Sequence, residues 1–119
     1  MRFLHSRGLT VAGGTAALAC GLLLPASAAA ADLEAGRHTF ETTCASCHGV
    51  TGRPDPASPV VQALGVEPAD LSDALFNSRE PANDWLIVVT HGGQALGLSA
   101  AMPAQGEALD DRQIRDVVA

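Results

Sequence analysis

The chain has no lysine and no tyrosine, and only four of its 119 residues are aromatic. All seven basic residues are arginines, and thirteen acidic residues bring the formal net charge to −6. This balance argues against a nucleic-acid-binding surface and against binding to an anionic membrane surface. The length predicts a single domain, and a single domain with so few large side chains can bury little core of its own.

Cysteine is also scarce, but two of the three cysteines lie close together in the sequence CASCHG at residues 44–49. Two cysteines separated by two residues and followed at once by histidine form the attachment signature of a c-type haem. The thiols of Cys44 and Cys47 can each add to one vinyl group of the porphyrin, and His48 can donate a ring nitrogen to the iron. Gly49 is expected to let the backbone pass close to the ring. A buried porphyrin would also supply the apolar volume that the chain lacks.

The same cysteine pair has two other interpretations. It is compatible with a redox dithiol of the thioredoxin type, which requires a βαβ context that this sequence does not show. It is also compatible with half of a zinc site. Zinc would have to recruit His38 and His91, which lie at no recognised ligand spacing. The third cysteine, Cys20, falls in a segment that we expect to be removed.

Residues 1–30 have the pattern of a signal peptide. A positively charged start is followed by an apolar, uncharged stretch and by small residues that fit cleavage after Ala28 or Ala30. Retention of this segment as a membrane anchor and lipidation at Cys20 are the alternatives. We expect cleavage and export to the periplasm. The remaining domain, residues 31–119, has five arginines against thirteen acids and a charge of −8.

Short motifs on both sides of the cysteines add a family resemblance. In chain order, the sequence resembles a class I cytochrome c of the small bacterial single-haem type at Gly36–Phe40, Cys44–His48, Pro68–Leu71, Trp85–Gly93 and Met102-Pro103. The resemblance covers residues 32–119. It implies an all-α fold of about four short helices around one covalently attached haem, and attachment of the haem after export.

Apolar periodicity and capping residues predict where these helices lie. The first is expected over residues 32–43 with Asp32 as its cap, and the resemblance implies that Gly36 lets it cross the last helix closely. The other three are expected at residues 58–64, at residues 83–90 with Asn83 or Asp84 as cap, and after Asp110 or Asp111 up to Ala119. Residues 50–59 and 77–81 are expected to be loops because they are rich in glycine, proline or polar residues.

Met102 is the candidate for the second axial ligand of the iron. A thioether is a soft ligand that suits haem iron together with histidine. The only other methionine is Met1, in the expected signal peptide. The alternatives are that Met102 is a core residue, or that His91 is the sixth ligand.

The resemblance implies further cofactor-binding residues. Phe40 is expected to pack beside the haem. The outer ring N–H of His48 is expected to be held by a proline carbonyl, for which Pro59 fits best and Pro56 next. Trp85 is expected either to donate its indole N–H to a haem propionate or simply to pack in the core.

These residues together predict a single-electron carrier, not an enzyme, that shuttles electrons between exported redox proteins of a respiratory chain. The alternatives are a haem peroxidase or ligand sensor with a dissociable methionine, and the cytochrome subunit of a larger dehydrogenase or oxidase. The chain has no lysines to form a basic docking ring, so two kinds of docking are open. Either the partner presents a basic patch to the acidic domain, or it docks on an apolar rim near Ala100, Ala101 and Pro103. We favour the rim because residues 97–104 carry no charge and flank Met102.

Overall fold

The structure, a computed structural model, describes residues 30–119. The expected signal peptide lies outside this part except for its last residue, and so does Cys20. Throughout the described residues the regular elements are helices, with no strand among them, which confirms the all-α fold. None of the helices in this part of the chain is long and apolar enough to cross a membrane.

The segment that leads to the cysteine motif is helical but not uniformly so. Helix α1 (Leu33–Thr39) begins at Asp32, whose side chain accepts hydrogen bonds from the backbone N–H groups of residues 34 and 35. A π-helical turn, η1 (Phe40–Cys44), and the short helix α2 (Ala45–His48) follow directly. The hydroxyl groups of Thr39 and Thr42 donate to carbonyls four residues earlier, a pattern that bends helices. The predicted helix over residues 32–43 is confirmed as helical, but its second half has π-helical and not α-helical hydrogen bonding.

Helices α3 (Pro59–Leu64) and α4 (Ala74–Arg79) form the middle of the chain. Helix α3 confirms the expected bounds, with proline at its first position and Gly65 ending it in the left-handed conformation at φ +67°. Helix α4 corrects the expected polar loop at residues 77–81. Asp73 caps it by accepting hydrogen bonds from two backbone N–H groups, and the helix then runs through the polar residues as far as Arg79.

Helix α5 (Ala82–His91) and the 3₁₀ turn η2 (Gly93–Leu96) lead to the segment that contains Met102. Helix α5 begins earlier than expected, because Pro81 stands at the N-cap in an extended conformation and neither Asn83 nor Asp84 is the cap. Asp84 lies instead in the first turn, where a carboxylate is favourable to the helix dipole.

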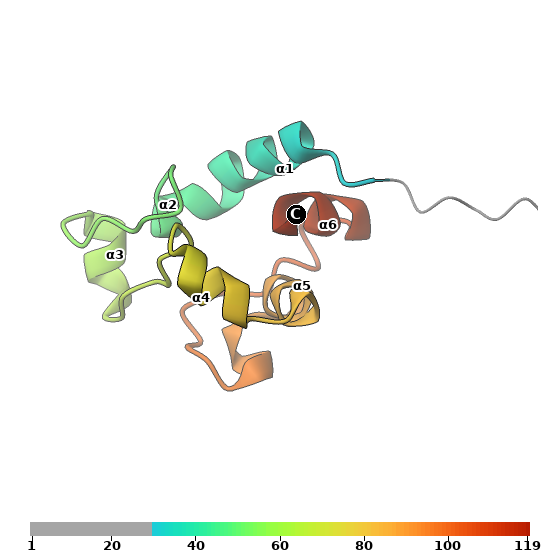
Figure 1. The fold of residues 1–119 in the computed structure, drawn as a ribbon. Coiled ribbons are helices and arrows are strands. Elements are labelled where there is room, and N and C mark those ends of the chain that lie inside the picture. The colour runs from blue at the N-terminus through green and yellow to red at the C-terminus, as the bar shows by residue number, and fades with distance from the viewer. Residues whose placement is uncertain (1–29) are drawn as a thin grey trace, which may run out of the picture.

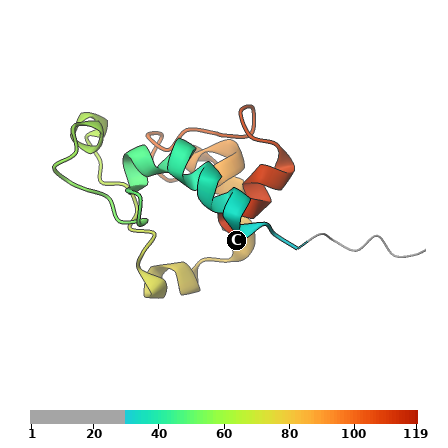
Figure 2. The same cartoon turned by 90° about the horizontal axis from the view of Figure 1, so that it is seen from above.

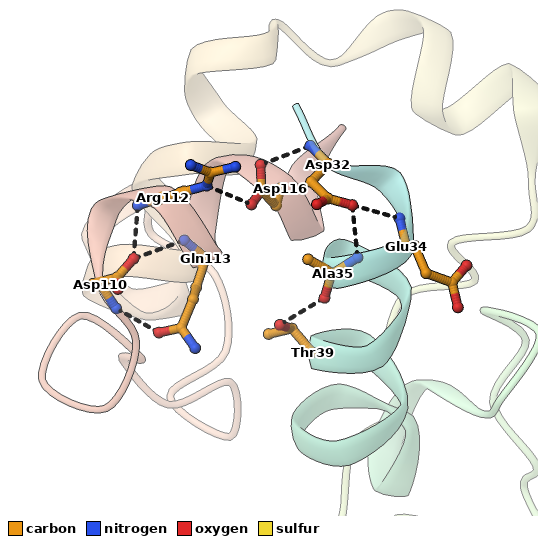
Figure 3. A network of polar contacts seen from close by, with 8 residues as sticks. All are labelled: Asp32, Glu34, Ala35, Thr39, Asp110, Arg112, Gln113 and Asp116. Carbon is orange, nitrogen blue, oxygen red and sulfur yellow. Dashed lines mark hydrogen bonds and ion pairs between the residues drawn. The ribbon is translucent and has the colours of Figure 1, made fainter. Parts of the chain in front are cut away.

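Helix α6 (Asp111–Val118) closes the fold against α1, and Figure 1 and Figure 2 both show the two helices side by side. Asp110 caps α6 in a capping box with Gln113. Gly36 of α1 faces the Asp116 main chain so closely that a Cβ atom there would lie 2.6 Å from its carbonyl carbon, which confirms the close crossing. Figure 3 shows that the buried Asp116 carboxylate also accepts the backbone N–H of Asp32, at 2.9 Å.

Little of the described chain forms a conventional core. Val61 and Ile114 are the buried hydrophobic residues of residues 30–119, and no large side chain in this part is fully buried. Helix α3 lies at one end of the molecule, away from α5 and α6 (Figures 1 and 2). Many apolar side chains of the other elements are half-buried and line a cavity, whereas Leu33, Leu75 and Leu96 are exposed.

Candidate functional site

A cavity of about 930 Å³ lies between the helices and the segment around Met102. Its volume is in the range of pockets that hold cofactors and other small molecules. Apolar and aromatic side chains make most of its wall: Phe40, Leu64, Val66, Leu71, Phe76, Trp85, Val88, Val89, Leu98, Val117 and Val118. The cavity therefore takes the place of the core and offers a largely apolar site for a ligand of cofactor size.

The two cysteines of the motif lie together on this wall. Cys44 ends the π-helical turn, Cys47 lies in α2, and both are half-buried free thiols. Burial raises the pKa of the Cys44 thiol, and the neighbouring Cys47 adds to the rise. Reactive dithiols need the opposite, a lowered pKa that favours the thiolate. This environment and the helical fold both disfavour a thioredoxin-type function.

His48 lines the same cavity, and its ring orientation is fixed from behind. Its Nδ1 atom lies 3.1 Å from the backbone carbonyl oxygen of Ala69. Because a carbonyl only accepts hydrogen bonds, this contact requires the proton on Nδ1. The Nε2 lone pair is then available to a metal, as is usual for metal-bound histidine with a carbonyl behind it.

The sequence predicted that a proline carbonyl, best that of Pro59, would accept the hydrogen bond from His48. In the structure the carbonyl of Ala69 has this role. Pro59 is exposed at the first position of α3, and neither it nor Pro56 lines the cavity. The turn at residues 68–71, which sequence analysis identified only as a family motif, supplies the carbonyl instead.

A second hydrogen-bonded layer holds this turn in place. The backbone N–H of Leu71 donates to the Gly52 carbonyl at 2.7 Å, and the Asp70 carboxylate accepts from both the N–H and the hydroxyl of Ser72. The two hydrogen bonds from Ser72 lower the pKa of the Asp70 carboxyl. Arg53, whose Nε lies 3.5 Å from this carboxyl, makes a smaller contribution. The turn that supplies the Ala69 carbonyl is therefore tied to Gly52 and held by hydrogen bonds from Ser72.

The structure gives Gly49 a reason to be glycine that does not involve the porphyrin. Its φ is +74°, and a Cβ atom there would collide with the carbonyl oxygen of Arg53. Glycine is needed because the chain reverses tightly after α2 and passes close to itself. This reversal brings residues 52–53 to the turn that holds His48.

Met102 also lines the cavity, although it is 54 residues after His48 in the chain. Phe40 and Trp85 lie on the wall as well, and the Trp85 ring packs edge-on against Phe76, with centroids 5.8 Å apart at 88°. His91, the other candidate ligand, is exposed at the end of α5 and is not part of the wall. The structure thus brings Met102, and not His91, to the same space as the cysteine motif.

Asn77 is a cavity residue that sequence analysis missed, because it was assigned to a polar loop. Its side-chain nitrogen donates to the Leu71 carbonyl at 2.6 Å. Its Oδ1 atom is buried and has no hydrogen-bond partner among the described residues. The residue as a whole lies on the cavity wall.

The donor set, the apolar lining and the volume of this cavity fit a haem c. Two thiols, an imidazole and a thioether face one apolar space, and these are the groups that attach and ligate such a haem. A zinc site fits less well, because residues 30–119 contain no group of three or more histidine, cysteine or acidic side chains that could hold a metal ion.

An all-α domain with this cavity and this cysteine–histidine motif is a cytochrome c domain. A family model described as cytochrome c oxidase, cbb3-type, subunit III matches residues 31–119, and the chain belongs to this family. Neither the curated proteins nor the solved structures compared with the chain gave a match. Membership of this family implies a haem c cofactor and haem-based electron transfer.

Proposed function

We propose that the chain is an exported single-electron carrier with one haem c. In this proposal the thiols of Cys44 and Cys47 bind the porphyrin covalently, and His48 and Met102 are the axial ligands. The observation that carries it is that all four side chains line one apolar cavity, although Met102 is far from the others in the sequence. The haem supplies the one-electron couple, and the protein holds it in a largely apolar site.

The surrounding residues have defined tasks in this proposal. The Ala69 carbonyl keeps the proton of His48 on Nδ1 and increases the basicity of Nε2. Phe40 and Trp85 line the cavity and would pack against the bound porphyrin, where they would reduce access of water. Two protein ligands leave no open position for substrate, and methionine favours ferrous iron and so raises the potential. These features suit rapid electron transfer.

Met102→Ala tests the ligand assignment. The wild-type ferric protein should show the sulfur-to-iron charge-transfer band. The variant should keep its covalent haem, lose that band and have a lower reduction potential. A matched control is His91→Ala, which should leave both unchanged because His91 is outside the cavity. If the wild type lacks the band, or if the band survives in Met102→Ala, Met102 is not the ligand.

Ligand binding separates the carrier from a peroxidase or sensor. A carrier with both axial positions filled should bind carbon monoxide or cyanide weakly at neutral pH, whereas a peroxidase or sensor needs an open distal site. Tight binding of carbon monoxide by the wild-type ferrous protein would favour the sensor.

The family description gives a second candidate, a cytochrome subunit of a cbb3-type oxidase. Both candidates share the haem chemistry and differ in the partner. Separation of native cells into soluble and membrane fractions, followed by purification of the protein from the fraction that contains it, distinguishes them. A carrier should be recovered alone in the soluble fraction after cleavage of residues 1–30, whereas a subunit should be recovered with the other oxidase chains.

The partner of the carrier is expected to dock on the apolar rim of Ala100, Ala101 and Pro103. Ala101 and Pro103 line the cavity next to Met102, and Leu98 on the same segment is 59% exposed. No charged residue lies between Gly97 and Ala104. Electron-transfer complexes are small and short-lived, so a neutral contact of this kind is sufficient.

A further inference from the structure

The segment that contains Met102 is attached to the end of α5 by main-chain hydrogen bonds. The N–H of Gln105 donates to the Val89 carbonyl at 2.9 Å, and the N–H of Gly106 donates to the Thr90 carbonyl at 3.0 Å. Val89 is itself part of the cavity wall. The segment after Met102 is therefore fixed to the wall on which the proposed haem would lie.

Met102 itself is held at both of its main-chain groups. Its carbonyl oxygen accepts the N–H of Gly93 at 3.0 Å, and its N–H donates to the Ser99 carbonyl at 3.3 Å. Gly93 also accepts, through its own carbonyl, the N–H of Leu98 at 2.9 Å. Gly93 is thus bonded to the segment at both ends of the stretch that leads to Met102.

Both glycines at this corner are buried where a side chain would displace the methionine segment. A Cβ atom at Gly93 would collide with the Ser99 carbonyl oxygen, which is the acceptor of the Met102 N–H. A Cβ atom at Gly92, where φ is +81°, would lie 3.0 Å from the Met102 carbonyl oxygen and 3.0 Å from the Ala104 nitrogen. In both cases the nearest obstructing atoms belong to the main chain of the segment that contains Met102.

Gly97, in the same segment, provides a contrast. Its φ is +72°, so it also has a left-handed backbone conformation. A Cβ atom there would have no atom within 4 Å. Glycine at residue 97 is therefore explained by the backbone conformation of the turn alone. Gly92 and Gly93, in contrast, also lie against the main chain around the proposed ligand.

We infer that the Gly92–Gly93 corner is a positioning site that holds the Met102 sulfur on the haem iron. The inference rests on the proposed ligation by Met102. A thioether is a neutral ligand, and its hold on the iron depends on how well the protein presents it. Displacement of the Ser99 carbonyl by a methyl group at residue 93 should move the Met102 main chain and weaken the sulfur–iron bond while the haem stays attached.

The experiment measures imidazole binding to the ferric haem protein. An external ligand binds only the fraction of molecules in which methionine has left the iron, so its apparent affinity rises in proportion to that fraction. Gly93→Ala should raise the imidazole affinity by about tenfold or more, toward the value of Met102→Ala, and weaken the charge-transfer band. Gly92→Ala should act in the same direction. Gly97→Ala is the matched control and should leave both readouts at their wild-type values.

All measurements are made well below the melting midpoint of each variant, so that unfolding does not contribute. Wild-type imidazole affinity in folded Gly93→Ala, or an equal rise in Gly97→Ala, would overturn the inference. Failure of both Gly92→Ala and Gly93→Ala to give a folded haem protein would also overturn it, by assigning the corner to folding alone. If the wild type itself binds imidazole as tightly as Met102→Ala, the proposed ligation has failed, which is a distinct outcome.

Discussion

The crossing of α1 and α6 gives a quantitative test of the packing at Gly36. Gly36→Ala places a methyl group against the Asp116 carbonyl group, 2.6 Å from its carbon and 3.1 Å from the Val117 nitrogen. These are main-chain atoms of a helix, so relief requires that the two helices separate. Separation would also stretch the 2.9 Å bond from the Asp32 N–H to the buried Asp116 carboxylate (Figure 3).

The two effects of this substitution have opposite signs. In an exposed helix interior, alanine is more favourable than glycine by about 1 kcal/mol. Overpacking costs about 1–3 kcal/mol, and loss of a hydrogen bond to a charged group costs about 1.5–3 kcal/mol. The crossing should dominate, so the free energy of unfolding should fall by about 2 kcal/mol, a large share of the roughly 5–15 kcal/mol that stabilises a typical domain.

Guanidinium unfolding of the ferric haem protein, followed by far-UV circular dichroism, measures this change. Ala35→Gly is the matched control, because residue 35 is the exposed neighbour on the same helix. It should lose about 1 kcal/mol from helix propensity alone. If Gly36→Ala proves as stable as the wild type or more stable, while Ala35→Gly is destabilised, the close crossing does not govern stability and this reasoning is refuted.

Replacing both Cys44 and Cys47 by serine should abolish haem attachment and cooperative melting, because the described residues bury almost no core without a ligand; a cooperative melt of the apo variant would contradict this. Hydrogen bonds from Ser72 lower the pKa of Asp70 below its ordinary value of 3.8. The ionised carboxylate therefore stabilises the fold at pH values above 3.8, and this stabilisation is lost as the pH falls through the lowered pKa. Asp70→Asn should therefore melt below the wild type at neutral pH, and the difference should vanish in acid. Electron-transfer rates with the native partner should change little with ionic strength if the apolar rim is the docking site. A steep fall with salt would instead favour a charged contact, in which reversal at Asp70 has a larger effect than Ala101→Lys.

The sequence alone determined the parts of the site that depend on short spacing. The motif from Cys44 to His48 follows from covalent geometry, because only a fixed separation lets both thiols reach one ring. Helix ends at Asp32 and Asp110 were also predictable, since a capping side chain acts on N–H groups two or three residues away. The need for a ligand to fill the core followed from composition, and the sparse core of residues 30–119 agrees with it.

Tertiary structure decided which distant residues meet these motifs. The carbonyl behind His48 belongs to Ala69 and not Pro59, because the chain reversal at Gly49 brings residues 52–53 against the turn at residues 68–71. A backbone carbonyl leaves no mark in the sequence, since every residue has one. Long-range packing alone selects which carbonyl is used.

The same holds for the elements that the sequence placed incorrectly. The π-helical turn before Cys44 lies beside side-chain hydrogen bonds from Thr39 and Thr42 to the main chain, and α4 begins at a cap on Asp73 despite its polar composition. The contacts of Gly92 and Gly93 with the methionine segment join residues that are five to twelve positions apart. They are made by main-chain atoms, whose positions come from the fold and not from side-chain identity. The sequence thus determined which groups can attach and ligate a haem, and the three-dimensional packing decided how each of them is held.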